Sequence, residues 1–173
     1  MRQLILGGAR SGKSALAERI AAASAREVVY VATAQPGDGE MAARIAHHRE
    51  RRPPHWLCIE EPLALAGVLR EHARDERCVL VDCLTLWLSN LLVHDDATRL
   101  HRERDALFDI LPALPGEILL VSNEVGLGVV PMGELTRRFV DEAGRLHQML
   151  AQRCERVLFV AAGLPLTLKD TSA

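Results

Sequence analysis

Short apolar runs alternate with longer helical patterns along most of the chain. The runs are continuous and rich in β-branched residues, as expected of strands covered on both faces of a parallel sheet. They lie at 4–6, 28–33, 78–82, 117–122 and 157–161. Between them, helical spacing or good helix formers predominate over about 15–23, 40–52, 63–75, 83–92, 98–111 and 133–153. This alternation predicts an α/β fold with a mostly parallel sheet flanked by helices.

The last apolar run, 164–168, follows its predecessor with only a short turn at Gly163. Parallel neighbours need a crossover of a dozen or more residues, whereas antiparallel neighbours can be joined by a tight turn. We therefore expect a short antiparallel strand at the C-terminal edge of the sheet. A chain of 173 residues suits a single domain, 1–173, with one buried core.

The junction between the first strand and the first helix fits the phosphate-binding template G-x-x-x-x-G-K-[ST] at every fixed position. Such a P-loop turns backbone N–H groups and the positive end of a helix toward phosphate oxygens. Lys13 is expected to reach the β- and γ-phosphates, and the Ser14 hydroxyl to bind Mg²⁺. The predicted nucleotide contacts cover the whole loop: Gly7, Gly8, Ala9, Arg10, Ser11, Gly12, Lys13 and Ser14.

A carboxylate follows the third apolar run, where Cys78–Val81 end in Asp82. Apolar strands often end in an acid, so this feature is weak evidence by itself. With a P-loop upstream it matches the Walker-B pattern, in which a buried strand delivers a carboxylate to the Mg²⁺ that the loop hydroxyl binds. We therefore expect Ser14 and Asp82 to bind one Mg²⁺ from two sides.

A basic helix is predicted from about Glu40 to Arg52, after a loop at the carboxyl end of the second strand. Open α/β sheets bind ligands at that edge. Arg44, His48 and Arg52 recur every four residues and would share a face. A charged run on a helix is often only a solvated face. The alternative is that its arginines face the bound phosphates and a neutral imidazole acts as a nucleophile.

Further polar residues belong to the same edge. Asn123 and Glu124 follow the fourth apolar run, and the glycine-rich segment after them predicts a mobile loop that faces phosphate or substrate. Glu60 and Glu61 precede Pro62, which is expected to open the helix over 63–75. These acids either complement the positive end of that helix or contact the nucleotide.

Composition and charge limit the classes of binding partner that the sequence supports. The formal charge is −2, with 21 basic and 23 acidic residues mixed along the chain, which indicates neither nucleic acid nor an anionic membrane surface. The four cysteines form no C-x-x-C pair and are expected to be free thiols, mostly buried. No apolar leader and no apolar run long enough to span a bilayer is seen, so we expect a cytoplasmic protein.

Two common P-loop classes lack their marks in this sequence. No N-K-x-D element follows the fourth strand, which disfavours a signalling GTPase. The L-S-G-G-Q element of transporter ATPases is also absent from the sequence, which disfavours that class. The remaining interpretation is a small metabolic phosphotransferase or nucleotidyltransferase.

Four blocks of sequence together resemble the bifunctional adenosylcobinamide kinase / adenosylcobinamide-phosphate guanylyltransferase family of cobalamin synthesis. The resemblance covers nearly the whole chain, and the blocks occur in order at matching spacing. They are the P-loop at 7–14, the segment 40–49 with Arg52-Pro53 and His55-Trp56, the segment 81–91, and the segment 121–126.

The resemblance implies a RecA-like P-loop fold and two reactions. A nucleoside triphosphate, ATP or GTP, phosphorylates adenosylcobinamide, and GMP from GTP is then attached to that phosphate with release of pyrophosphate. The pattern R-I-x-x-H-[RK] places the nucleophile that carries GMP at His48, with Lys13 as the other catalytic residue. The family is also expected to be homo-oligomeric, with a trimer as the expected assembly. Beyond the P-loop, the expected nucleotide contacts are Thr33, Ala34, Gln35, Arg49, Glu50, Arg51, Arg52, Glu60 and Asp82.

Two other interpretations stay open at this point. The first is a P-loop kinase without guanylyltransferase activity, in which His48 is a solvated helix residue. The second is a non-enzymatic RecA-like protein that binds nucleotide and assembles. Transfer of label from GTP distinguishes the first from a guanylyltransferase, and nucleotide-dependent self-association without corrinoid turnover would identify the second.

Overall fold

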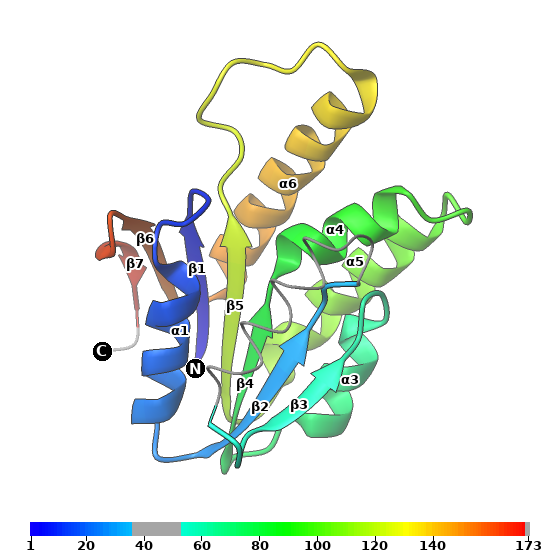
Figure 1. Cartoon of the computed structure of the whole chain (residues 1–173). Coiled ribbons are helices and arrows are strands. Elements are labelled where there is room, and N and C mark those ends of the chain that lie inside the picture. Colours follow the sequence, from blue (N-terminus) through cyan, green and yellow to red (C-terminus); the bar gives the residue numbers. More distant parts are fainter. Residues whose placement is uncertain (36–52, 172–173) are drawn as a thin grey trace.

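Seven strands form one sheet in the computed structural model, which describes residues 1–35 and 53–171 (Figure 1). The strand order is β3-β2-β4-β5-β1-β6-β7, and every neighbouring pair is parallel except β6 and β7. The bounds are β1 Arg2–Gly7, β2 Glu27–Ala32, β3 Leu57–Glu60, β4 Arg77–Asp82, β5 Glu117–Asn123, β6 Arg156–Ala161 and β7 Leu164–Asp170. The predicted mostly parallel sheet with an antiparallel C-terminal edge strand is confirmed. The helix predicted over 40–52 lies outside the described residues.

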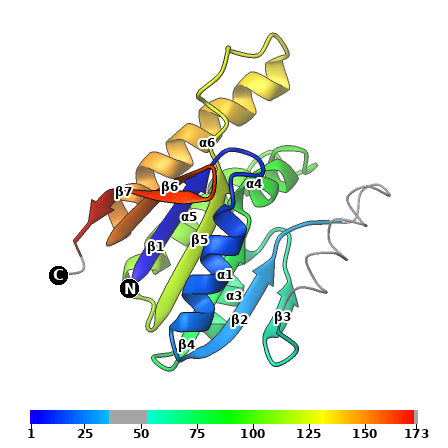
Figure 2. The ribbon, with the colours of Figure 1, turned by 60° about the vertical axis from the view of Figure 1, so that its left-hand side comes forward.

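Helices cover both faces of the sheet (Figure 2). Among the described helices, α1 (Lys13–Ala23) packs on one face, against β1, β4 and β5. The opposite face carries the others: α3 (Leu65–His72), α4 (Leu84–Leu92), α5 (Arg99–Ile110) with the 3₁₀ turn Leu111–Ala113, and α6 (Glu134–Arg153). The predicted apolar segment after Asp82 is a core helix, since its Leu84, Trp87, Leu88 and Leu91 are buried.

The central strands are buried on both faces because successive residues alternate between two apolar layers. In β1 and β5, Leu4, Leu6 and Leu120 pack against α3 to α6. Ile5 and Val121 pack against α1. Each fully buried aliphatic side chain stabilises the fold by roughly 1.5–3 kcal/mol, so these continuous apolar runs fix the sheet's centre.

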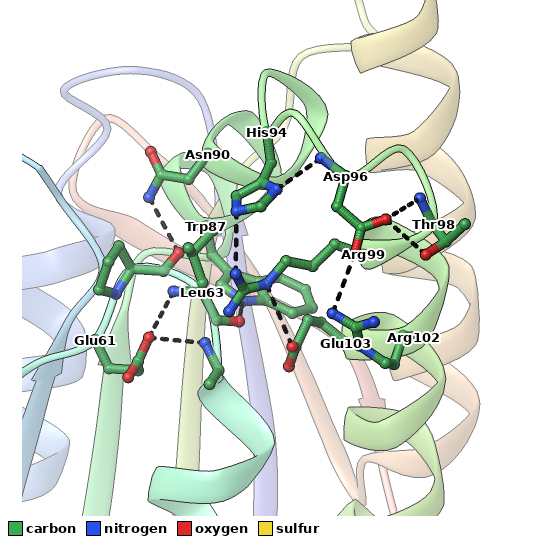
Figure 3. Close-up of polar contacts among 12 residues, drawn as sticks. Glu61, Leu63, Trp87, Asn90, His94, Asp96, Thr98, Arg99, Arg102 and Glu103 are labelled. Carbon is green, nitrogen blue, oxygen red and sulfur yellow. Dashed lines mark hydrogen bonds and ion pairs between the residues drawn. The ribbon is translucent and has the colours of Figure 1, made fainter.

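Two elements differ from the sequence expectations. β3 was not predicted, because its residues Leu57, Cys58 and Glu60 are exposed and lack a continuous buried pattern. The helix expected over 63–75 begins at Leu65 and ends at His72. Ahead of it, the Glu61 carboxylate accepts hydrogen bonds from the backbone N–H groups of residues 63 and 64, at 2.8 and 2.7 Å (Figure 3). Glu61 therefore complements this helix start, as one of the two interpretations proposed.

The amino-terminal part of α6 extends beyond the sheet (Figure 1). Its Leu135 is consequently 55% exposed, whereas Leu146 and Leu150, further along the helix, are buried in the core. The large apolar side chains of α6 are thus buried only where the helix lies over the strands. The loop between β5 and α6 forms no helix, as expected, and is largely exposed.

Candidate nucleotide-binding site

The P-loop connects the end of β1 with the start of α1, where the sequence predicted it. Gly7 is required sterically, since a Cβ atom there would lie 2.4 Å from the Val160 carbonyl oxygen. Gly12 has a φ of 97°, in the left-handed region that favours glycine. The loop is held by hydrogen bonds from Ser11 N to the Gly8 oxygen at 3.2 Å and from Gly163 N to the Ser11 oxygen at 2.8 Å. Its shape is therefore fixed by the strands around it.

The first N–H groups of α1 face the same loop. No side-chain cap satisfies them at Gly12 within the part of the chain that the structure describes. The first four N–H groups of a helix have no partner inside the helix, and their dipoles favour a bound anion. This end of α1 is therefore suited to phosphate oxygens.

Lys13 is only 8% exposed, and its ammonium donates a hydrogen bond to the Gly8 carbonyl oxygen at 3.1 Å. Burial lowers the pKa of Lys13, and the nearby Asp82 carboxylate opposes that shift. The loop hydrogen bond holds the ammonium over the site where phosphates would lie. A buried cation with a weak neutral partner can exchange that partner for a phosphate oxygen.

Asp82 ends β4 at the same edge, as predicted. β5 lies between β4 and β1, and Asp82 is level with Val121 of β5, which is itself level with Ile5 of β1. The buried Tyr30 hydroxyl of β2 donates a hydrogen bond to Asp82 Oδ2 at 3.0 Å. This bond orients the carboxylate and leaves its other oxygen for a ligand. Tyr30 was not predicted as a site residue, because a tyrosine in an apolar strand gives no signal beyond core packing.

The predicted contacts at the end of β2 have different surroundings. Thr33 is fully buried, and its hydroxyl bonds both the carbonyl and the N–H of Cys83, at 2.6 and 2.9 Å. It therefore joins the ends of β2 and β4 and positions the segment after Asp82. Ala34 is partly exposed and Gln35 exposed, directly beyond that junction, and Glu60 ends the neighbouring strand β3. All four residues lie at the carboxyl edge.

The donors at this edge fit Mg²⁺. The Ser14 hydroxyl and the Asp82 carboxylate supply hard oxygen ligands, and Mg²⁺ in phosphate-binding sites uses one or two carboxylates together with substrate phosphates. No group of three or more His, Cys, Asp or Glu side chains that could bind a metal occurs among residues 1–35 and 53–171.

The sequence also missed a buried polar cluster beside Asn123 and Glu124. His147 of α6 contacts Ser122 and Glu124 on the face of the sheet that α3 to α6 cover. A histidine on the apolar face of an amphipathic helix is the signal that could have found it. The predicted site residues His48, Arg49, Glu50, Arg51 and Arg52 lie outside the described residues.

The remaining sequence expectations concern cysteines and membranes. All four cysteines are free, with Cys78, Cys83 and Cys154 buried and Cys58 exposed. Burial raises the pKa of Cys83 to about 11, with a further contribution from Asp82, so its thiol stays protonated beside the site. Within the described part of the chain, every helix is too short or too polar to cross a membrane.

Solved structures share this fold at low sequence identity. The chain aligns with a protein from Pyrococcus horikoshii OT3, PH0250, with a TM-score of 0.54 and 9% identity, over 98% of this chain and 86% of that one. An ATPase from a bacterial type III secretion system gives a TM-score of 0.54 at 12% identity, over 96% of this chain and 57% of the other. The RadB recombinase gives 0.50 at 18% identity, over 91% and 73%. These neighbours confirm the predicted RecA-like P-loop fold.

Sequence relatives are much more similar. The bifunctional adenosylcobalamin biosynthesis protein CobP of Pseudomonas aeruginosa is 68% identical over 169 residues, which cover 98% of both chains. The bifunctional adenosylcobalamin biosynthesis protein CobU of Escherichia coli is 37% identical over 182 aligned residues, which cover 98% of this chain and all of that one. A family model described as cobinamide kinase / cobinamide phosphate guanyltransferase matches residues 3–168. The chain therefore belongs to the cobinamide kinase / cobinamide phosphate guanyltransferase family of transferases.

Proposed function

We propose that this protein phosphorylates adenosylcobinamide with ATP or GTP and then converts the product to adenosylcobinamide-GDP with GMP from GTP. The observation that supports this most is the P-loop with Lys13 close to Asp82 at one sheet edge, in a chain whose family match covers nearly its full length. That edge suits a triphosphate with Mg²⁺, and the family description provides the acceptor.

In the first reaction, the acceptor hydroxyl oxygen attacks the γ-phosphorus. A new phosphorus–oxygen bond forms while the bond to the β–γ bridging oxygen breaks, and the electron pair leaves with the nucleoside diphosphate. Lys13 stabilises the charge on the phosphoryl oxygens, since preorganised cations account for most of the catalysis in phosphoryl transfer. Mg²⁺ bound by Ser14 and Asp82 would neutralise phosphate charge.

In the second reaction, a nitrogen of His48 attacks the α-phosphorus of GTP and pyrophosphate leaves. A phosphate oxygen of adenosylcobinamide phosphate then attacks the same phosphorus and breaks the phosphorus–nitrogen bond. The covalent step divides one difficult transfer into two easier displacements, of which the first uses a neutral nucleophile. The arginines at 49, 51 and 52 are proposed to contact the nucleotide, as are Thr33, Gln35 and Glu60.

The protein is further proposed to be a cytoplasmic homo-oligomer, with a trimer as the expected assembly and residues 1–173 as one catalytic domain. Size-exclusion chromatography with light scattering measures the oligomeric state directly. A monomer at micromolar concentration would contradict that part of the proposal.

Product analysis tests the two reactions. The enzyme is incubated with adenosylcobinamide, Mg²⁺ and either γ-labelled ATP or α-labelled GTP. With γ-labelled ATP, we expect label in the corrinoid monophosphate. With α-labelled GTP, we expect label in the corrinoid product of the second reaction. Formation of the monophosphate without any α-labelled corrinoid would show that the protein is a kinase without guanylyltransferase activity.

A further inference from the structure

A buried chain of polar groups runs from α4 through β5 to α6 at the carboxyl edge of the sheet. Thr85 Oγ1 accepts a hydrogen bond from Asn123 N at 2.7 Å and lies 3.3 Å from Ser122 Oγ. Ser122 Oγ lies 2.8 Å from His147 Nε2. On the other side of the ring, Nδ1 of His147 lies 3.5 Å from Glu124 Oε2. Three elements therefore converge on one glutamate.

The hydrogen-bond partners fix the direction of this chain. Because Thr85 Oγ1 receives the Asn123 N–H, its own hydroxyl hydrogen is available to Ser122. Ser122 can then donate to His147 Nε2, which leaves the hydrogen of a neutral imidazole on Nδ1. The opposite tautomer would place a nitrogen lone pair against the Glu124 carboxylate. For a neutral imidazole beside a carboxylate, this arrangement satisfies the bonds from Asn123 to His147 and directs the Nδ1 hydrogen at Glu124.

The imidazole is isolated from solvent and has a specific target. The His147 side chain is 7% exposed, and burial lowers its pKa against the opposing effect of Glu124. Within the residues that the structure describes, Nδ1 is buried without a hydrogen bond of normal length. Glu124 Oε2 lies 3.5 Å from Nδ1, so a small displacement of that carboxylate would complete the bond. The neighbouring buried positions of α6 on this face are apolar, namely Ala143, Leu146 and Leu150.

Glu124 stands where the reacting groups would meet. β5 lies between β1, which carries the P-loop, and β4, which ends in Asp82. The Glu124 N–H donates to the Gly7 carbonyl oxygen at 3.0 Å, directly at the first residue of the P-loop. Its side chain is 21% exposed, and the carboxylate Oε1 accepts a hydrogen bond from Gly126 N at 2.7 Å. One oxygen is therefore held by the loop, and the other faces the buried His147, while the carboxylate as a whole stays partly exposed.

We propose that Glu124 orients and deprotonates the acceptor hydroxyl during phosphorylation, and that His147 is a positioning residue that holds the Glu124 carboxylate. The inference rests on the proposed kinase reaction. When the hydroxyl oxygen bonds to the γ-phosphorus and the nucleoside diphosphate leaves, the hydroxyl proton passes to the Glu124 carboxylate. Glu124 is partly exposed, so the proton then passes to solvent and the site is restored. Ser122 and Thr85 fix the tautomer of His147.

Kinase kinetics of Glu124→Gln test the role of the glutamate. The substitution keeps the shape and the acceptor for Gly126 N–H but removes the base. We expect kcat for phosphorylation to fall by about 10²-fold or more, the usual contribution of general base catalysis. The KM for nucleotide should change less than about threefold, since the nucleotide contacts remain. Glu134→Gln, at the exposed start of α6, is the matched control and should keep the wild-type kcat.

A double-mutant cycle tests the role of His147. His147→Phe removes the ring's hydrogen bond to Ser122 and its polar contact with Glu124 at similar volume, and should lower kcat by about 10-fold through misplacement of the carboxylate. In the Glu124→Gln background the same substitution should have no further effect on kcat, because no base remains to be positioned. Ser122→Ala, a smaller change, should lower kcat several-fold. His101→Phe, at an exposed position of α5, is the control.

The outcomes separate this inference from the proposed function. Guanylylation of the protein by α-labelled GTP should persist in Glu124→Gln, which shows that the variant is folded and binds nucleotide. If wild-type protein phosphorylates cobinamide and Glu124→Gln does so at the same kcat, the inference is wrong and the proposed function stands. Equal, independent losses from His147→Phe in both backgrounds would show that His147 acts structurally. No phosphorylation by the wild type would refute the proposed function itself.

Discussion

Replacement of Lys13 by Met removes one cation from the P-loop and keeps an unbranched side chain of similar length. At about 4 Å and an effective dielectric constant of about 20, two unit charges interact by roughly 4 kcal/mol. Loss of that interaction from the transition state corresponds to a fall of about 10³-fold in rate. Single preorganised donors in other active sites contribute about 10²- to 10³-fold. We therefore expect phosphorylation of cobinamide by Lys13→Met to fall by about 10²- to 10³-fold.

The same substitution should not destabilise the fold. Lys13 is 8% exposed, and burial lowers its pKa, so its charge is less favourable in the folded than in the unfolded chain. For a lysine with a lowered pKa, this penalty is present at neutral pH and is relieved as the pH rises through the folded pKa. Lys13→Met at neutral pH should accordingly have a Tm equal to or above that of the wild type.

Two measurements on the same samples check this prediction. Kinase turnover is measured by transfer of γ label, and thermal unfolding is measured with and without nucleotide and Mg²⁺. Nucleotide at about 100 times its Kd should stabilise the wild type by about 2.7 kcal/mol, or roughly 5–10 °C in Tm for a chain of this length. Lys13→Met should lose most of that rise. Normal turnover by a stable Lys13→Met protein would refute the assignment of the P-loop.

Other substitutions test the Asp82 carboxylate, its partner Tyr30, and the turn at Gly116 that precedes β5. Asp82→Asn keeps shape but removes charge, so activity should fall and a Mg²⁺ titration of activity should shift to higher concentration; an unchanged titration would leave Asp82 an ordinary strand-end acid. Tyr30→Phe removes the hydroxyl that donates the 3.0 Å hydrogen bond to Asp82, so the same shift should appear in weaker form, and its absence would separate Tyr30 from the metal site. Gly116→Ala places a Cβ atom 2.1 Å from the Arg74 carbonyl oxygen at a φ of 76°. Its Tm should fall by several degrees, since each kcal/mol lost lowers Tm by roughly 2–4 °C in a chain of this length. Gly144→Ala, with open space around the added Cβ atom, is the control and should not lower Tm.

The parts of the fold that the sequence predicted best are those where the local signal and the tertiary role coincide. The central strands are buried on both faces, so their apolar runs are continuous, and the P-loop needs fixed residue types at fixed spacing. β3 escaped prediction because an edge strand with exposed residues needs no such run. Leu135 lies in the helix predicted over 133–153 but is exposed, because helix periodicity does not report where α6 extends beyond the sheet.

The site was predicted where one residue carries a recognisable role and was missed where partners come from distant parts of the chain. Asp82 was found because an acid ends a strand downstream of a P-loop. Tyr30 and His147 reach the site through hydrogen bonds between residues 52 and 25 positions apart, which no local pattern encodes. The Thr33 hydroxyl illustrates the same limit: it bonds the Cys83 backbone, a partner that only the sheet topology provides.

The central claim, that this P-loop protein is also a guanylyltransferase with a histidine nucleophile, is tested most directly by labelling the protein alone with GTP. The wild type should acquire label from α-labelled GTP, release pyrophosphate and acquire none from γ-labelled GTP. The adduct should be lost in acid and kept in alkali, because protonated imidazole is a good leaving group from a phosphoramidate. His48→Ala should abolish the adduct and keep part of the kinase activity, whereas His47→Ala, the matched neighbour, should retain most of the label. An acid-labile adduct that survives in His48→Ala, or wild-type protein that acquires no α label, would contradict the account.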